Sequence, residues 1–279
     1  YAAWRKANPN PPLIPVKTIP LHHAPVYLAG AADVAAIFGA PEEKGNFVIG
    51  ATREQGHPVC LNLEKFIQRS SGIFGATGTG KSFLTRIILA GLIHYNAASI
   101  LIFDMHNEYG FDDIASDTKK RVPGLRAKFP GRVRVVGLGR GSIRTDQVPD
   151  FNLEIGMNEI TPADVEMLSR ELNLKETTPT TLDALVHSFG RERWFIEFMQ
   201  LRPGAVVENE DGKKVPAPDS VEAWAADAGV NSMAASALHS KLQRIKNRAY
   251  VVEKAEGDAL NEIIRSLQAG KHIVLSFGN

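Results

Sequence analysis

The chain has 279 residues, of which 44% are hydrophobic and 23% are charged, and its formal net charge is +1 at pH 7. This composition excludes the disordered and fibrous classes and is typical of a globular protein. The overall electric field of such a chain is weak, so any nucleic-acid binding must come from a local cluster of basic side chains. The length predicts two domains, or one core that carries a large insertion.

Cysteine content and hydropathy limit the kinds of site and partner that we expect. Cys60 is the only cysteine, which excludes an internal disulfide and a zinc site built from several cysteines, and a cytoplasmic location is the default expectation. No apolar run reaches the ~20 residues of a membrane-spanning helix, and residues 1–20 lack the hydrophobic core of a signal peptide. We therefore expect no membrane partner.

The first 67 residues differ from the rest of the chain in their pattern of apolar and turn-forming residues. They begin with a proline-rich stretch and continue with short apolar runs at residues 26–28, 47–49 and 59–61, which glycines and prolines separate. Runs of this length, with turn residues between them, are typical of strands. Residues 1–67 are therefore predicted to form a small all-β domain.

From Ser70 onward the pattern changes to strand, glycine-rich loop, helix and strand. The runs 73–74 and 100–103 are apolar at every position, as expected for parallel strands that are covered on both faces. A third strand is predicted at residues 132–139. We interpret residues 68–279 as an α/β domain.

Residues 150–270 are predicted to be a mainly helical insertion in this α/β domain. Thr161 and Pro162 make a good N-cap and first-turn pair for one helix. A last helix is expected to start near Asp258 and to stop at Gly270, and a further core strand follows at residues 273–277.

The strongest motif is a phosphate loop at residues 75–82, GATGTGKS, which matches G-x-x-x-x-G-K-[ST] at every position. Its glycines let successive N–H groups point inward, and the following helix adds its positive N-terminal end. Lys81 would bridge the β- and γ-phosphates, and the Ser82 hydroxyl would complete the coordination of Mg²⁺. ATP and Mg²⁺ are the expected cofactors, with these binding residues: Gly75, Ala76, Thr77, Gly78, Thr79, Gly80, Lys81, Ser82 and Phe83.

An ordinary glycine loop that matches the motif by chance is the alternative. The expected strand before the loop and the amphipathic helix after it both argue against chance, because the motif requires that context.

A second motif, ILIFDMHNEYG, places Asp104 at the end of a buried strand and Glu108 four residues later. Ligands gather at such strand ends in open α/β sheets. Asp104 could hold a magnesium-bound water or orient a base, and Glu108 could polarise the attacking water. The alternative makes Asp104 a turn or helix cap and Glu108 a surface charge, and the residues alone leave both interpretations open. His106 has no surrounding set of metal ligands and is expected to be packed or hydrogen-bonded.

Together these segments resemble the HerA branch of the HerA and FtsK ATPases, which are hexameric DNA-pumping motors. GIFGATGTGKS and DMHNEY are similar to the family's phosphate loop and its acidic-histidine-acidic-tyrosine motif, and residues 71–110 are the most specific part. NFVIGATREQGHPVCLNL looks like the final strands of the HerA barrel domain, and GKHIVLSFGN like the next core strand. The resemblance covers most of the chain and implies a RecA-like P-loop ATPase core with a helical insertion, preceded by a small β-barrel.

This resemblance implies a homohexamer that uses ATP hydrolysis to move double-stranded DNA and works with a nuclease in repair or with another effector in antiviral defence. Arg69 resembles an arginine that assists catalysis in the family, although an exposed, structurally neutral arginine is the alternative. Asn107 stands where the family often has glycine. The family's acidic pair, sensor glutamine and arginine finger are expected after Asn279.

Two rival functions belong to different classes. One is a related ATPase of conjugation or secretion, which a membrane-docking segment would favour. The other is an ATP-gated scaffold, which binds nucleotide to set its oligomeric state and to position an effector. DNA-stimulated turnover of ATP would distinguish the motor from the scaffold.

Residues 119–144 are rich in Lys and Arg and contain no Asp or Glu, and we call this segment the basic island. Clusters of this kind bind phosphate backbones without reading the base sequence, so the basic island provides the candidate DNA contacts. A helix near residues 238–248, with Lys241, Arg244 and Arg248 on one face, is a second candidate. Solvated faces or subunit contacts are the alternative for both. The island consists of Lys119, Lys120, Arg121, Arg126, Lys128, Arg132, Arg134, Arg140 and Arg144.

Overall fold

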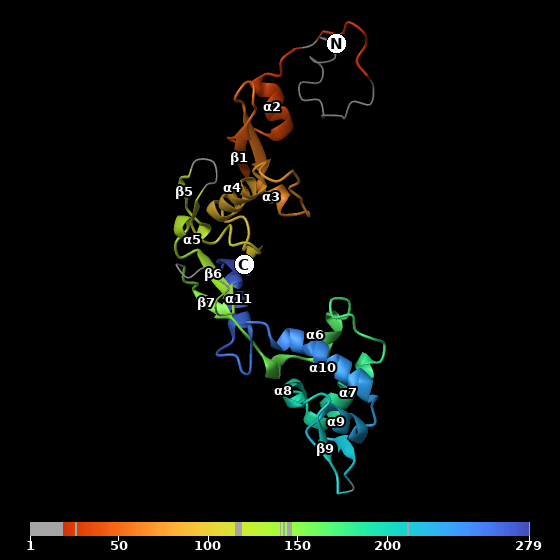
Figure 1. Cartoon of the computed structure of the whole chain (residues 1–279). Coiled ribbons are helices and arrows are strands. Elements are labelled where there is room, and N and C mark those ends of the chain that lie inside the picture. The colour runs from red at the N-terminus through yellow and green to blue at the C-terminus, as the bar shows by residue number, and fades with distance from the viewer. Residues whose placement is uncertain are drawn as a thin grey trace. The chain divides into compact units, whose positions relative to one another are not determined.

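The computed structural model divides the chain into two compact units, Tyr1–Ile100 and Leu101–Asn279, which are described separately (Figure 1). The predicted domain boundary between residues 67 and 68 stays a prediction. No helix in the described part of the chain is both long and apolar enough to cross a membrane. The structure describes residues 19–25, 27–114, 119–139, 141, 143, 147–210 and 212–278.

The first unit contains an antiparallel hairpin, β1 with β2, and the helix that follows the phosphate loop, α4. Phe47 of the hairpin lies so close to Gly91 of α4 that a Cβ on this glycine would come within 2.7 Å of the phenyl ring. Leu63, Ile88 and Leu92 complete the buried core. The hairpin and the helix therefore share one core. The elements are α2 (Ala31–Phe38), β1 (Asn46–Ala51), β2 (Pro58–Asn62), α3 (Leu63–Phe66) and α4 (Lys81–His94).

The all-β prediction for residues 1–67 is confirmed for two runs and wrong elsewhere in the described part. Residues 47–49 and 59–61 lie in β1 and β2, whereas residues 27 and 28 form no strand and Val26 lies outside the described residues. Helix α2 was not predicted; its sequence AADVAAIF is rich in alanine, the best helix former, and the Asp33 carboxylate accepts the Gly30 N–H at 2.9 Å. The described residues of this segment form no closed barrel.

The predicted strand at residues 73–74 is also wrong, because residues 71–76 have no regular secondary structure. The run is only two residues long, and Gly72 and Gly75 flank it. Glycine loses much conformational freedom on folding and adds no side-chain packing to a strand. The helix predicted after the motif is confirmed, since α4 begins at Lys81.

A four-stranded parallel sheet is the centre of the second unit, with the strand order β3-β12-β6-β7. The last strand along the chain, β12, thus lies between β3 and β6, and its Ser276 is in register with Asp104 of β3. Helix α11 packs against the sheet through Ile263, which shares a core with Ile273 and Leu275 of β12. The three core strands predicted in this region are confirmed. The elements are β3 (Leu101–Asp104), β6 (Val133–Leu138), β7 (Phe151–Leu153), α11 (Ala259–Gln268) and β12 (His272–Ser276).

A short hairpin and one helical turn connect β3 with β6. Strands β4 (Asp113–Ile114) and β5 (Arg121–Val122) pair antiparallel, and α5 (Leu125–Lys128) follows them directly. This connection carries most of the described basic island.

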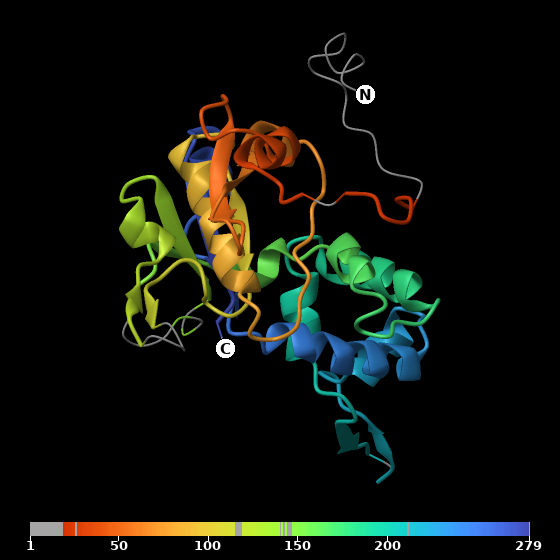
Figure 2. The same cartoon turned by 90° about the horizontal axis from the view of Figure 1, so that it is seen from above.

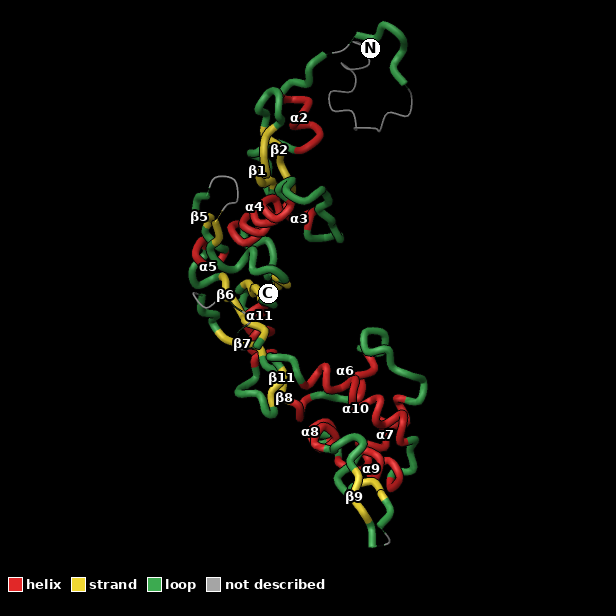
Figure 3. Tube along the Cα trace, in the orientation of Figure 1, coloured by secondary structure: helices red, strands yellow, loops and turns green. Residues whose placement is uncertain are grey.

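The stretch predicted to be mainly helical contains helices α6 to α10, from which the hairpin of β9 and β10 projects (Figures 1 and 2). Strands β8 and β11 pair in parallel beside these helices (Figure 3). The elements are β8 (Ile155–Gly156), η1 (Met157–Glu159), α6 (Pro162–Met167), α7 (Thr178–Phe189), α8 (Trp194–Gln200), β9 (Val206–Glu208), β10 (Lys214–Pro216), α9 (Val221–Asp227), α10 (Ser232–Lys246) and β11 (Val251–Val252).

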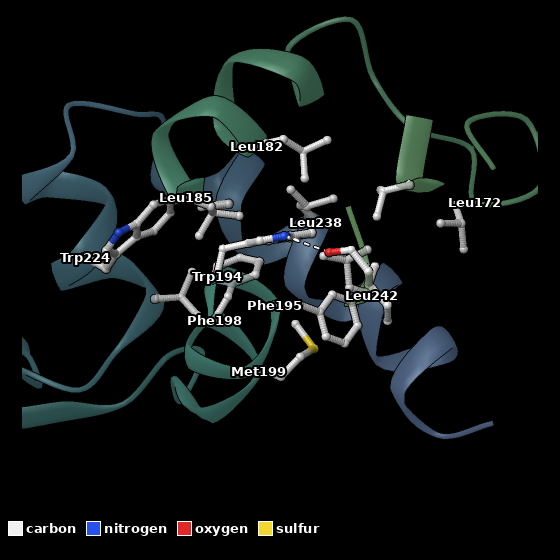
Figure 4. Close-up of a cluster of buried hydrophobic side chains, with 14 of the residues drawn as sticks. Leu172, Leu182, Leu185, Trp194, Phe195, Phe198, Met199, Trp224, Leu238 and Leu242 are labelled. Carbon is white, nitrogen blue, oxygen red and sulfur yellow. Dashed lines mark hydrogen bonds between the residues drawn. The ribbon is translucent and has the colours of Figure 1, made fainter. Parts of the chain in front are cut away.

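The helices pack around an aromatic core of their own (Figure 4). Trp194, Phe195 and Phe198 of α8 are fully buried, and the Trp194 indole N–H donates to the Ile160 carbonyl at 2.9 Å. The predicted N-cap at Thr161 is confirmed: its hydroxyl accepts the Asp164 N–H, and Pro162 is the first helical residue. The helical part thus has a hydrophobic core that is distinct from that of the sheet.

Candidate nucleotide site

The phosphate loop is built from left-handed glycines and a helix start. Gly78 has a φ of 82°, and Gly80, the N-cap of α4, has a φ of 90° and a ψ of 17°. Most residues with a side chain avoid this conformation, which is why glycine is needed at both positions. At Gly75, a Cβ would lie 2.6 Å from the Thr79 hydroxyl. The three glycines therefore permit the tight curl that the motif requires.

Most of the backbone donors of this loop have no acceptor within the protein. In the described residues, the N–H groups of Gly78, Gly80, Lys81 and Ser82 make no hydrogen bond, whereas Thr79 N–H donates to the Ala76 carbonyl at 3.3 Å. The loop glycines are exposed, so these donors are open to an external anion. Unsatisfied N–H groups at the positive end of a helix favour phosphate binding.

Lys81 is held in place by the loop itself. Its Nζ donates to the Ala76 carbonyl at 2.8 Å, and the Thr79 hydroxyl donates to the same oxygen at 2.8 Å. The Lys81 and Ser82 side chains are half-buried, while Phe83 is exposed. This donor set of amides, one ammonium and one hydroxyl fits a nucleoside triphosphate with its Mg²⁺, because phosphate oxygens and waters supply most of that metal's ligands and the protein need supply few.

Asp104 lies at the carboxyl end of β3 and is 1% exposed. Its carboxylate accepts three backbone N–H groups: Glu108 at 2.8 Å, Tyr109 at 2.8 Å and Gly110 at 3.3 Å. Asp104 is therefore the cap of the turn that follows β3, as one of the two interpretations of the motif expects. We call residues 104–112 the acidic loop.

Asn107 stands in the acidic loop where the family often has glycine, and its backbone has a conformation that glycine favours. Asn107 has a φ of 56°, a left-handed conformation that glycine adopts freely and that asparagine tolerates better than most residues. Glu108 is half-buried and His106 is exposed. Arg69, which belongs to the first unit, is also exposed.

Two residues were not expected from the sequence, one at the carboxyl end of β12 and one in the connection between β3 and β6. Ser276 is 1% exposed, and its hydroxyl has no hydrogen-bond partner among the described residues. Asp112 accepts the Gly124 N–H at 2.7 Å and pairs with Arg121, and these bonds hold the pKa of its carboxyl below its usual value. No local pattern indicates Asp112, because its partners lie 9 and 12 residues away.

The basic island divides into bonded arginines and exposed lysines. Arg121 pairs with Asp112, Arg126 lies 3.6 Å from Asp150, and Arg134 lies 2.8 Å from Glu262. Arg132 also has a partner in the structure. Arg140 and Arg144 lie outside the described residues. The exposed cations of the described island are Lys119, Lys120, Lys128 and Arg121, and of these Arg121 is the one that pairs with Asp112.

The second basic candidate, on α10, is less suited to DNA. The Lys241 ammonium donates to the Asn173 carbonyl, while Arg244 and Arg248 line a largely apolar cavity of about 650 Å³. Glu171 and Asp258 line the same cavity, together with further acidic residues. Acidic neighbours and apolar walls oppose a phosphate backbone.

Comparison with known proteins adds one match. Residues 47–278 match the family described as "Helicase HerA, central domain", a range that includes the phosphate loop, the acidic loop and every strand of the parallel sheet. No curated protein matches the chain. The chain therefore belongs to the HerA central-domain family, which is a family of ATPases of the HerA/FtsK kind.

Proposed function

We propose that this protein is an ATP-driven motor that moves double-stranded DNA through a homohexameric ring, with a RecA-like core. The observation that carries the proposal is the phosphate loop, whose open N–H groups and Lys81 are present in a chain of the HerA family. The parallel sheet is of the kind that a RecA-like core contains. A nuclease or an antiviral effector is the partner that we expect for such a motor.

Lys81 would exchange its present acceptor for phosphate when ATP binds. The Nζ now donates to the neutral Ala76 carbonyl, and a hydrogen bond from an ammonium to a phosphate oxygen is stronger because both groups carry charge. Ser82 would provide the protein's hydroxyl ligand to Mg²⁺, which neutralises charge on the phosphates when bound. The loop is thus arranged to bind the triphosphate without a large change in its backbone.

Asp104 is assigned in this proposal to holding the acidic loop that carries Glu108. A carboxylate has about four lone-pair sites, and three backbone N–H groups use most of them. One site is left for a magnesium-bound water, so a metal role is compatible with the capping role. Glu108 is proposed to orient the attacking water, and Arg69 to assist the charged site.

DNA contact is assigned to the lysines of the island rather than to its arginines. Lys119, Lys120 and Lys128 are exposed, whereas Arg126 and Arg134 have carboxylate partners within the fold. Lysines neutralise phosphates without reading sequence, which suits a motor that must move along any DNA. In a ring, a neighbouring subunit would supply further positive charge to the reacting phosphate.

The test measures ATP turnover with and without duplex DNA, in the wild type and in a Lys119→Glu/Lys120→Glu variant. We expect DNA to stimulate turnover in the wild type. The variant should bind DNA more weakly and lose about one unit of salt dependence for each lost phosphate contact. Its turnover without DNA should be unchanged, because neither lysine belongs to the phosphate loop. A Lys213→Glu/Lys214→Glu variant, altered in the β9–β10 hairpin, is the matched control.

The outcomes separate the motor from the scaffold. Tight ATP binding without turnover, in the presence or absence of DNA, would contradict the motor and support the ATP-gated scaffold. Equal DNA affinity in the wild type and in the Lys119→Glu/Lys120→Glu variant would remove the island as a DNA contact.

A further inference from the structure

The unit Leu101–Asn279 contains a cavity of about 650 Å³ that the proposed motor does not use. Its wall is formed by segments that are far apart in the sequence: α6 with the residues after it, the end of α10, the paired strands β8 and β11, and the start of α11. Pockets for small ligands commonly have volumes of about 300–1,000 Å³ and mostly apolar walls. The cavity therefore has the size that suits one small organic molecule.

The floor of the cavity is apolar and belongs to the core of the helical part. Val165, Leu172 and Val251 line the cavity and are all buried. They are members of the hydrophobic cluster shown in Figure 4, in which Leu172 is labelled. Side chains that the fold already holds in place need little further ordering when a ligand covers them. The floor is thus suited to receive an apolar group.

Two leucines of the cavity wall are exposed to water. Leu168 is 39% exposed and Leu260 is 61% exposed, and they belong to different parts of the wall. Transfer of apolar surface out of water is favourable. A ligand with an apolar body would cover these side chains and gain affinity from them.

Residues 244–250 supply three polar groups to the same cavity. These are the guanidinium groups of Arg244 and Arg248 and the phenolic hydroxyl of Tyr250. In the described part of the chain, none of the three groups has a hydrogen-bond or ion-pair partner. A guanidinium can hold a carboxylate with two parallel N–H bonds, and a hydroxyl can donate one more. This segment therefore offers donors that suit an anionic group.

Most acidic side chains of the cavity wall are engaged within the fold. Three carboxylates accept a backbone N–H at 2.8–3.1 Å in the first turn of a helix, whose positive end offsets part of their charge. A fourth also has a partner in the structure. Glu171 alone has none among the described residues, so two free guanidinium groups accompany one free carboxylate. The four engaged residues are Glu159, Asp164, Asp258 and Glu154.

We propose that this cavity binds a small apolar molecule that carries one carboxylate. The apolar body lies on the floor of the cavity, and the carboxylate is held by Arg244 and Arg248. A DNA backbone does not fit this description, because it carries many charges and no apolar body. The site shares no residue with the phosphate loop or with the basic island, so its test needs neither ATP nor DNA.

The first test compares ligands that have the same chain and different head groups. Decanoate, decanol and decylammonium are titrated into the whole protein at neutral pH, below the concentrations at which they form micelles. Decanoate should bind about 10-fold or more tightly than decanol, because its charge strengthens the bonds from the guanidinium groups. Octanoate should bind about 10-fold more weakly than decanoate, since it buries two methylene groups fewer.

These titrations can overturn the proposal in two ways. Tighter binding of decylammonium than of decanoate would show that the acidic side chains of the wall select the ligand. Absence of decanoate binding to the wild type would show that the cavity does not take this class of molecule. Neither result would bear on the proposed motor, whose own test is DNA-stimulated turnover of ATP.

The second test removes the two guanidinium groups. In Arg244→Gln/Arg248→Gln, decanoate affinity should fall about 10-fold or more, to the level of decanol, while decanol affinity stays as in the wild type. Lys213→Gln/Lys214→Gln is the matched control, because it loses the same charge at two exposed residues that do not line the cavity. Equal decanoate affinity in the wild type and in the arginine variant would contradict the assignment of the carboxylate.

The third test fills the cavity. Leu168→Trp adds volume at a partly exposed position of the wall, so it should weaken decanoate and decanol alike by about 10-fold. Met233→Trp is the control, since Met233 is exposed and does not line the cavity. Wild-type affinity of Leu168→Trp for both ligands would place the bound molecule elsewhere and overturn the proposal.

Discussion

The phosphate loop and the acidic loop differ in what their backbone N–H groups bind: those of the phosphate loop are open to an external anion, and those of the acidic loop bind a carboxylate of the protein itself. In the phosphate loop, the N–H groups of Gly78, Gly80, Lys81 and Ser82 have no acceptor in the described residues, and the loop glycines are exposed. In the acidic loop, the buried Asp104 carboxylate already accepts three N–H groups. A turn with open donors is suited to bind an external phosphate, whereas a turn with its own carboxylate is suited to hold a shape.

This contrast changes the interpretation of the second motif. An acidic residue at the end of a parallel strand indicates a ligand site by its position, but the bonds of Asp104 first explain the conformation of the loop. Asp112 repeats the arrangement eight residues later with the Gly124 N–H and Arg121. The acidic loop thus contains two internal anions, and each fixes a different end of it.

The largest effect on stability is expected from Asp104→Ala. Removal of a buried acceptor leaves three N–H groups without their partner, so the free energy of unfolding should fall by about 3 kcal/mol. Lys81→Ala, in the phosphate loop, should change it by less than about 0.5 kcal/mol. Chemical denaturation of both variants measures this difference.

Asp113→Ala is the control for Asp104→Ala, since its side chain is exposed on the same connection. If Asp104→Ala unfolds at the same denaturant concentration as the wild type but no longer turns over ATP, capping of the turn after β3 does not contribute measurably to stability. Asp104 would then act chiefly on the magnesium-bound water.

A smaller effect is expected in the pH dependence of stability. The Gly124 N–H and Arg121 lower the pKa of Asp112 in the folded state, so its contribution is fully present above the unfolded pKa. It is lost as the pH falls through the folded pKa. Between about pH 6 and about pH 3, the wild type should therefore lose more stability than Asp112→Asn does.

Lys81→Ala should keep the wild-type slope over this pH range, because residues 75–82 contain no acidic side chain. Unfolding curves recorded across the range provide the comparison. Equal slopes in Asp112→Asn and in the wild type would show that the Asp112 carboxylate has no stabilising partner when folded.

The sequence predicted what depends on local pattern. The helix after the phosphate loop, the N-cap at Thr161 and the three core strands of the second unit follow from periodicity and capping rules, and all are present. The strand at residues 73–74 was predicted from an apolar pair and did not form, since a run of that length depends on pairing that the sequence cannot show. Helix α2 was not predicted because its helix signal lies in its alanines, whereas the pattern of short apolar runs in this segment indicates strands.

Contacts between distant residues were beyond sequence reasoning. The basic island was predicted from a count of charges, but the acidic partners of Arg126 and Arg134 lie outside it, at Asp150 and Glu262. A Cβ on Gly124 would meet the backbone of Phe111, a residue that no spacing rule connects with it. Such pairings require the fold, because the chain brings them together only when the β4–β5 hairpin and the sheet have formed.

ATP binding by Lys81→Ala tests the central claim most directly. Labelled ATP with Mg²⁺ is titrated into the wild type, into Lys81→Ala and into Lys44→Ala, which removes an exposed lysine of the same unit as a control. We predict that affinity falls about 30-fold or more in Lys81→Ala, equivalent to about 2 kcal/mol, and is unchanged in Lys44→Ala. Equal ATP affinity in all three proteins would contradict the assignment of residues 75–82 as the nucleotide site.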